Sequence, residues 1–74
     1  MATINLVGRK FEMTQFDPRK GYVTSPVKVV GQADGETEDI VEVKWEDHLT
    51  FGEGYIQSIS ISNFIKDASY EIIL

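Results

Sequence analysis

The feature that most constrains the fold is an alternating stretch at residues 38–47. Within it Val41, Val43 and Trp45 occupy every second position, and charged residues stand between them. A period of two places the apolar side chains on one face of an extended chain and the charged side chains on the other. Valine and tryptophan are also favoured in strands. The pattern therefore predicts a central β-strand with Trp45 in the core.

The length of 74 residues limits the chain to one domain, residues 1–74, with a small core. The chain has no cysteine, which excludes disulfides and thiolate zinc sites and favours a cytoplasmic protein. No apolar run reaches the roughly 20 residues that span a bilayer, and the N-terminus lacks the pattern of a signal peptide. A homodimer or higher oligomer is an alternative to a monomer, because self-association can complete so small a core.

A hairpin is predicted in the first half of the chain. Residues 9–16 and 22–30 are extended by composition, and the Asp-Pro-Arg-Lys-Gly sequence between them is typical of a tight turn. Phe16 and Tyr22 flank this turn, so we expect them to pack across the strand ends. Pro26 lies inside the second segment and predicts an edge strand or a break, because proline cannot donate to a ladder.

Short strands are also predicted towards both ends of the chain. Residues 3–7 form the first of them, and residues 55–62 alternate between apolar residues and serines. Residues 63–67 interrupt that alternation and are expected to form one helical turn, after which residues 70–74 form the last strand. The alternative is a single helix over residues 62–74, whose apolar residues also fit a helical stripe.

These elements predict an all-β, mainly antiparallel fold: a small five-stranded barrel or sandwich with one short helical turn near residues 63–67. The sequence Ser62-Asn63-Phe64-Ile65, between two predicted strands, resembles the close of an SH3-like barrel, where one helical turn precedes the final strand. The resemblance implies the fold alone, because the peptide-binding aromatic motif of SH3 domains is not recognisable in this chain.

Enzymatic chemistry is not expected from this sequence. The single histidine, His48, lies beside Asp47, but no nucleophile motif is present and a domain of this size rarely encloses a deep cleft. Residues 34–39 contain four carboxylates without the spacing of an EF-hand. We therefore predict no catalytic residues, no metal site and no cofactor, with weak calcium binding by the 34–39 loop as the alternative to a solvated loop.

The distribution of charge points to a binding function. The formal net charge is −5, and the acidic residues concentrate in the middle of the chain. We predict a non-enzymatic binding module that docks on a basic surface of a partner protein, because an acidic face steers such partners at long range. One version is an inhibitor of a nucleic-acid-processing or defence protein, whose carboxylates imitate phosphates. The competing interpretation is an acidic face that only maintains solubility. The expected partner-binding residues are Glu36, Glu38, Asp39, Glu42, Glu46 and Asp47.

The basic first part of the chain supports a second hypothesis, the binding of nucleic acid. A variant of it is the binding of a phosphorylated small molecule such as a nucleotide, in an oligomer whose interface makes the pocket. Basic and aromatic side chains of a small β domain can hold phosphates and stack on bases, although the acidity of the whole chain opposes a polyanion. No membrane partner is expected. The residues concerned are Arg9, Lys10, Arg19, Lys20 and Lys28, with Phe16 and Tyr22 as stacking platforms.

Overall fold

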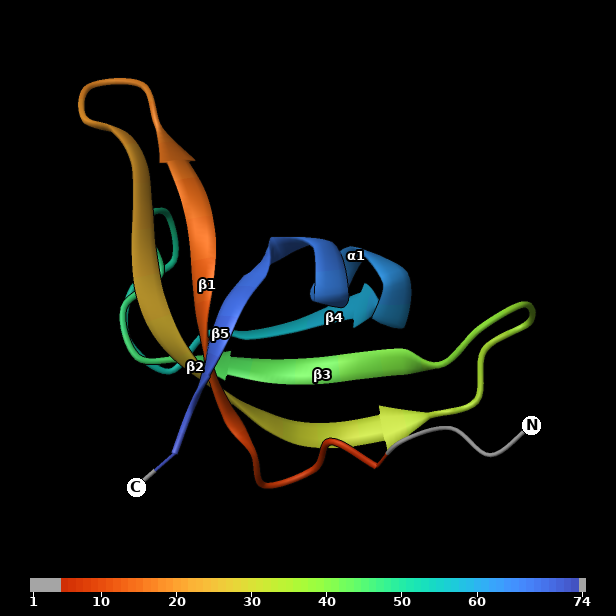
Figure 1. Ribbon diagram of the computed structural model, residues 1–74. Coiled ribbons are helices and arrows are strands. Elements are labelled where there is room, and N and C mark those ends of the chain that lie inside the picture. Colours follow the sequence, from red (N-terminus) through yellow and green to blue (C-terminus); the bar gives the residue numbers. More distant parts are fainter. Residues whose placement is uncertain (1–4, 74) are drawn as a thin grey trace.

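One antiparallel sheet and one short helix make up the computed structural model, which describes residues 5–73 (Figure 1). The strand order across the sheet is β4-β3-β2-β1-β5. The mainly antiparallel β fold is thus confirmed, as is a helical turn before the last strand. The elements are β1 (Lys10–Asp17), β2 (Gly21–Ala33), β3 (Ile40–Trp45), β4 (Ile56–Ser60), α1 (Ile61–Asp67) and β5 (Ala68–Ile72).

The sheet is open, which corrects the expected barrel or sandwich. β4 and β5 are its two edges, and in residues 5–73 they do not pair with each other. The helix α1 connects these edges and directs Phe64 into the core, where its ring meets Phe11 edge-on with centroids 5.0 Å apart. The helix therefore covers the inner side of the sheet. In a barrel the opposite strands would cover this side, and in a sandwich a second sheet would cover it.

The long strand β2 bends the sheet. Its first part pairs with β1 as far as Lys28, and its second part pairs with β3 from Val27 onward. The register with β3 shifts between Val29 and Gly31, and such an irregularity bends a strand and increases its twist. In Figure 1 the hairpin of β1 and β2 consequently rises steeply away from β3 and β4.

Pro26 lies within β2, a central strand, so the expected edge strand or break is wrong. The carbonyl of Pro26 accepts the backbone N–H of Glu46 at 3.1 Å. In an antiparallel strand the N–H and C=O of one residue face the same neighbour, so the nitrogen of Pro26 also faces Glu46, which lies beyond the end of β3 at Trp45. The missing donor therefore removes no bond from the paired part of the ladder.

The inner face of β3 forms the centre of the core, as predicted. Val41 and Val43 are fully buried and Trp45 is only 3% exposed. The indole N–H of Trp45 donates to Oε1 of Gln57 at 3.1 Å, which satisfies its one polar group. The buried hydrophobic residues are Leu6, Phe11, Met13, Val27, Val29, Val41, Val43, Trp45 and Phe64.

The predicted hairpin turn is confirmed in its details. Oδ1 of Asp17 accepts the backbone N–H of Arg19 at 2.8 Å, and Gly21 closes the turn with φ at +85°. The rings of Phe16 and Tyr22 meet across the strand ends at 5.3 Å. A short Asp side chain and a left-handed Gly are the local features that such a turn requires.

The predicted end strands have different outcomes. The expected strand at 3–7 falls partly on residues 1–4, which lie outside the described residues, and the chain from 5 to 9 turns at Gly8 with φ at +90°. At the other end the strand β5 follows α1, so the alternative of one long helix is wrong. The helix begins at Ile61, two residues earlier than expected. Residue 74 also lies outside the described residues.

Candidate functional site

Three lysines form a row across the outer face, which is the exposed side of β1, β2 and β3. Lys10 pairs with Lys28 across β1 and β2, and Lys28 pairs with Lys44 across β2 and β3. All three side chains are exposed. On the outer strands, Lys10 also pairs with Ile72 of β5, and Lys44 pairs with Ile56 of β4. Lys10, Lys28 and Lys44, here called the lysine row, therefore lie directly opposite one another on adjacent strands.

The lysine row forms no ion pair with any other described residue. Within residues 5–73 the one ion pair joins Arg9 to Glu71, which are not members of the row. Like charges directly opposite each other in a sheet are destabilising. The row contains two such pairs, one on each side of Lys28. An anionic ligand would replace this repulsion by attraction.

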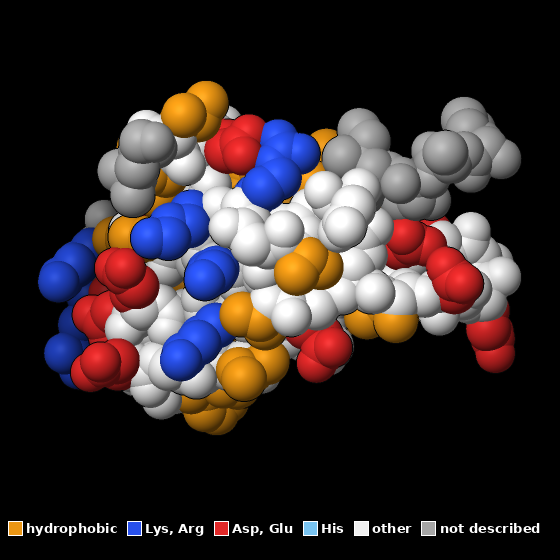
Figure 2. Space-filling model, turned by 90° about the horizontal axis from the view of Figure 1, so that it is seen from below, with side chains coloured by type: hydrophobic (Ala, Val, Ile, Leu, Met, Phe, Trp, Pro, Cys, Tyr) orange, Lys and Arg blue, Asp and Glu red, His pale blue; other side chains and the backbone are white. Residues whose placement is uncertain are grey.

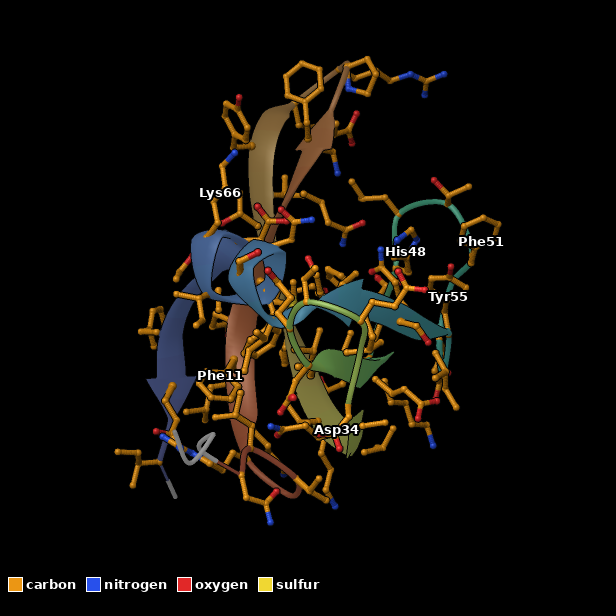
Figure 3. The ribbon with its side chains drawn as sticks, turned by 90° about the vertical axis from the view of Figure 1, so that its right-hand side faces the viewer. Phe11, Asp34, His48, Phe51, Tyr55 and Lys66 are labelled. Carbon is orange, nitrogen blue, oxygen red and sulfur yellow. The ribbon has the colours of Figure 1, made fainter. Side chains whose placement is uncertain are left out.

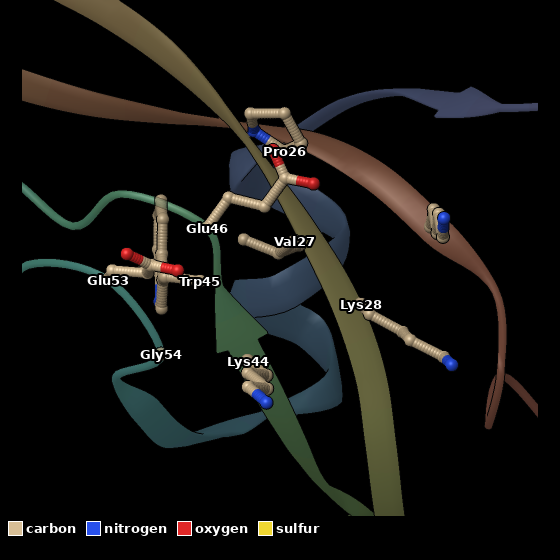
Figure 4. Close-up of a pocket in the computed structure, with 9 residues that line it drawn as sticks. Pro26, Val27, Lys28, Lys44, Trp45, Glu46, Glu53 and Gly54 are labelled. Atoms are coloured by element: carbon tan, nitrogen blue, oxygen red, sulfur yellow. The ribbon is translucent and has the colours of Figure 1, made fainter.

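The lysine row borders a hollow of about 680 Å³ on the outer face. Pro26 lies beside the row in this hollow, and Glu46 and Glu53 line it as well. Figure 4 shows Lys28 extending away from the carboxylates of Glu46 and Glu53, with Lys44 below them in the view. The ammonium groups are therefore open to a ligand.

Carboxylates surround the lysine row without pairing with it. Glu42 on β3 and Glu46 just after its end lie two residues to either side of Lys44, so all three share the outer face. The carboxylate of Glu42 lies over Gly31: its Oε1 is 2.6 Å from the place where a Cβ would stand on that glycine. The outer face thus has a positive centre and a negative rim, and Figure 2 shows Lys and Arg side chains gathered beside Asp and Glu side chains.

Two of the six predicted partner-binding carboxylates have partners inside the molecule. Glu38 accepts the backbone N–H of Ser62 at 2.9 Å and its hydroxyl at 2.7 Å, at the start of α1. These hydrogen bonds lower the pKa of Glu38 below its ordinary value. Asp39 accepts a hydrogen bond from the side-chain amide of Gln32 at 2.9 Å. Glu38 and Asp39 therefore help to hold the fold.

The other four predicted acidic residues are exposed but do not form one surface. Glu36 lies in the loop before β3, Asp47 follows the other end of β3, and Glu42 and Glu46 lie on the outer face. A six-residue strand is about 20 Å long, which separates the two ends of this set. Lys44 also interrupts it in the middle. The predicted acidic surface is thus divided into a loop, a strand face and a strand end.

The predicted basic set is divided in the same way. The Nε of Arg9 donates to Oε2 of Glu71 at 2.7 Å, and this hydrogen bond raises the pKa of Arg9 and lowers the pKa of Glu71. Arg19 and Lys20 lie at the exposed tip of the β1–β2 hairpin, and Tyr22 is exposed next to that tip. Of the predicted basic residues, Lys10 and Lys28 belong to the lysine row.

Sequence reasoning missed Lys44 as a candidate binding residue, because it stands among carboxylates in the chain. The pairing of Lys10 with Lys28 could have been found, since the turn at residues 17–21 determines the register of the hairpin. The pairing of Lys28 with Lys44 could not, because a six-residue loop and a register shift separate these two residues.

The single histidine organises the turn between β3 and β4. Nδ1 of His48 accepts the backbone N–H groups of Thr50 and Phe51 at 3.1 and 3.2 Å. Its ring packs against Trp45 and Tyr55, with centroids 5.0 and 4.8 Å apart. Figure 3 shows His48, Phe51 and Tyr55 together at this turn. The half-buried ring of His48 thus has a structural role.

A second concavity, of about 360 Å³, lies beside α1 and β5. Its walls are mostly apolar and include Phe11, Phe64, Ile65 and Tyr70, with Arg9 among the polar residues. Ile65 and Tyr70 are exposed there, whereas Phe64 is only 2% exposed. The wall of this concavity therefore contains both exposed apolar side chains and side chains of the core.

Neither a metal-binding group nor a related protein helps to identify the site. Among the described residues no group of three or more His, Cys, Asp or Glu side chains could hold a metal ion. No helix in residues 5–73 is long and apolar enough to cross a membrane. Comparisons with protein families, curated proteins and solved structures found no match. The outer face, with its lysine row, is thus the candidate binding surface of the described residues.

Proposed function

We propose that this chain is a non-enzymatic binding module that docks on a partner protein through the outer face. The observation that carries the proposal is the charge pattern of that face, in which the lysine row has no ion-pair partner among residues 5–73 and is flanked by exposed carboxylates. A protein surface with the complementary pattern would satisfy both signs of charge at once. Such complementarity gives an interface its specificity and increases the rate of association.

The same pattern makes nucleic acid a weaker candidate. A nucleic-acid strand carries negative charge along its whole length, so it extends past the lysine row into the carboxylate rim. Glu42 and Glu46 would then repel it on both sides of Lys44. The net charge of −5 adds a repulsion that acts before contact. A folded partner, by contrast, can place basic groups opposite that rim.

We also infer a relation to SH3-like barrels at the level of the fold. The antiparallel strand order and the single helical element before the last strand support this inference. The unpaired edges of β4 and β5 depart from a closed barrel. The inference concerns architecture only, and the docking proposal does not depend on it.

Charge reversal on the outer face tests the docking proposal. The immobilised chain is used to retain proteins from a lysate at low salt, after nuclease treatment. We expect the double variant Glu42→Lys with Glu46→Lys to lose the retained partner. The matched control reverses two exposed loop carboxylates, Asp34→Lys with Glu36→Lys, and changes the net charge equally.

The control determines how the result is interpreted. Retention by the loop variant together with loss by the outer-face variant would support docking through the outer face. Loss only in the loop variant would show that the partner binds at the other end of β3. Equal loss in both variants would show that only long-range attraction by the net charge holds the partner, which would contradict the proposal.

A further inference from the structure

We propose that the lysine row is a binding site for a phosphate group that the partner presents. This inference rests on the proposed function and adds the chemistry of the anchoring group. Lys10, Lys28 and Lys44 stand opposite one another on three adjacent strands, and no carboxylate of the described residues forms an ion pair with them. The ligand therefore has to supply the opposite charge.

Three lysines in this arrangement can act on a single group. Neighbouring strands lie about 4.8 Å apart, so Lys10 and Lys44 flank Lys28 at that spacing on either side. The flexible four-carbon stem of lysine carries a compact charge with three donors, and stems from adjacent strands can reach a common point above the central residue. The hollow beside the row leaves that space open (Figure 4).

A phosphate matches the row better than a carboxylate does. A phosphorylated side chain carries a charge of about −1.5 to −2 at pH 7 and offers three strong acceptor oxygens. Each ammonium of the row can therefore bond a different oxygen. A single carboxylate carries one negative charge and would leave much of the repulsion around Lys28 in place. The three ammonium groups can thus each meet one phosphate oxygen, and a phosphate compensates more of the row's positive charge than a carboxylate does.

The rim restricts the ligand to a compact anion. Glu42 and Glu46 lie two residues to either side of Lys44 on the outer face, and Glu53 lines the hollow. One phosphate over Lys28 occupies the positive centre alone. A chain of phosphates extends into them, and its repulsion grows with each further group. The site therefore favours an isolated phosphate, as on a phosphorylated protein segment, over an oligonucleotide.

A titration of the isotopically labelled chain, followed by NMR, tests the inference. The probes are inorganic phosphate, a phosphoserine hexapeptide, the same peptide with glutamate, and a single-stranded oligonucleotide. We expect the phosphopeptide to shift the amides around Lys10, Lys28 and Lys44 and to bind more tightly than the other three probes. Inorganic phosphate is expected to shift the same amides more weakly, which separates a free phosphate from a peptide-borne one.

Two variants identify the groups involved. We expect Lys28→Gln to weaken phosphopeptide binding about tenfold or more, because a charge-assisted hydrogen bond is lost. The matched control Lys66→Gln removes an exposed lysine of α1, away from the outer face, and is expected to change binding by less than about twofold. Thermal melting of both variants confirms that they are folded. Phosphopeptide binding that is unchanged by Lys28→Gln would overturn the inference.

The pH dependence separates phosphate from carboxylate recognition. The second pKa of a phosphorylated residue lies near 6, so phosphopeptide affinity is expected to fall as the pH is lowered from about 7.5 to 5.5. The glutamate peptide stays ionised over that range and is expected to show no such fall. Tighter binding of the glutamate peptide or of the oligonucleotide would contradict the inference.

Phosphatase treatment of the lysate distinguishes failure of this inference from failure of the proposed function. Partner retention that is lost after phosphatase and in Lys28→Gln supports both proposals. Retention that survives phosphatase but is lost in the outer-face reversal Glu42→Lys with Glu46→Lys overturns the phosphate inference alone. Retention that is indifferent to phosphatase, to Lys28→Gln and to that reversal overturns both.

Discussion

The two faces of β3 differ in what holds their side chains. On the inner face Val41, Val43 and Trp45 are buried and held by packing. On the outer face Glu42 and Lys44 are exposed and form no ion pair within the described residues. One strand therefore contributes stability on one side and unsatisfied charge on the other. The proposed docking face is thus the side of β3 whose charged groups have no ion-pair partner among the described residues.

Two carboxylates near β3 also differ in whether they have partners inside the fold. Glu38 hydrogen-bonds to Ser62 at the start of α1, whereas Glu42 has a glycine, Gly31, beneath it. In the chain the two residues look alike, as acids of one acidic stretch. Negative charge alone therefore does not mark a docking residue, because part of it is used inside the fold.

The largest effect is expected on the inner face of β3. Trp45→Ala should cost about 3–5 kcal/mol, because it removes a large buried side chain and leaves a cavity. A loss of this size is comparable with the whole stability of so small a domain. A urea melt followed by circular dichroism measures it. A change below about 1 kcal/mol would show that packing against Trp45 is not what holds this face.

A smaller loss is expected at Glu38, which joins the acidic stretch to α1. Because the pKa of Glu38 is lowered in the folded state, its ionised form stabilises the fold above its ordinary pKa near 4.5. That contribution is lost as the pH falls through the lowered value. Glu38→Gln should therefore reduce the melting temperature at pH 7, and the difference from the unmodified chain should shrink towards pH 3.

The matched control for Glu38 is Glu36→Gln, which changes an exposed carboxylate of the same loop. We expect the melting curves of Glu36→Gln and of the unmodified chain to coincide at pH 7. Equal losses in the two variants would mean that general acidity of the loop, and not the bonds to Ser62, stabilises the start of α1.

The smallest effect, and one of opposite sign, is expected on the outer face. Lys28→Thr removes both like-charge pairs of the lysine row, so it should raise the free energy of unfolding by roughly 0.2–1 kcal/mol. Lys10→Thr removes only one pair and should raise it less. Urea melts at low and high salt measure the difference, which salt should reduce. Destabilisation by Lys28→Thr would show that the row is not repulsive.

Much of the local structure could be predicted from the sequence. The alternation around Val43 assigned the two faces of β3, and Asp17 with Gly21 identified the hairpin turn. Both signals are local, since side-chain direction in a strand and turn geometry depend on neighbouring residues. The place of Pro26 in a central strand could not be predicted, because it depends on where the adjacent strand ends, and no local pattern shows that.

The sequence by itself therefore determined the strand faces, the hairpin turn and the burial of Trp45. The tertiary structure alone decided that the sheet stays open under α1, that Glu38 meets Ser62, and that Lys44 stands opposite Lys28. These contacts join segments that are distant in the chain. Their partners depend on inter-strand register and on the path of the β4–β5 connection, and neither is encoded in the periodicity of one segment.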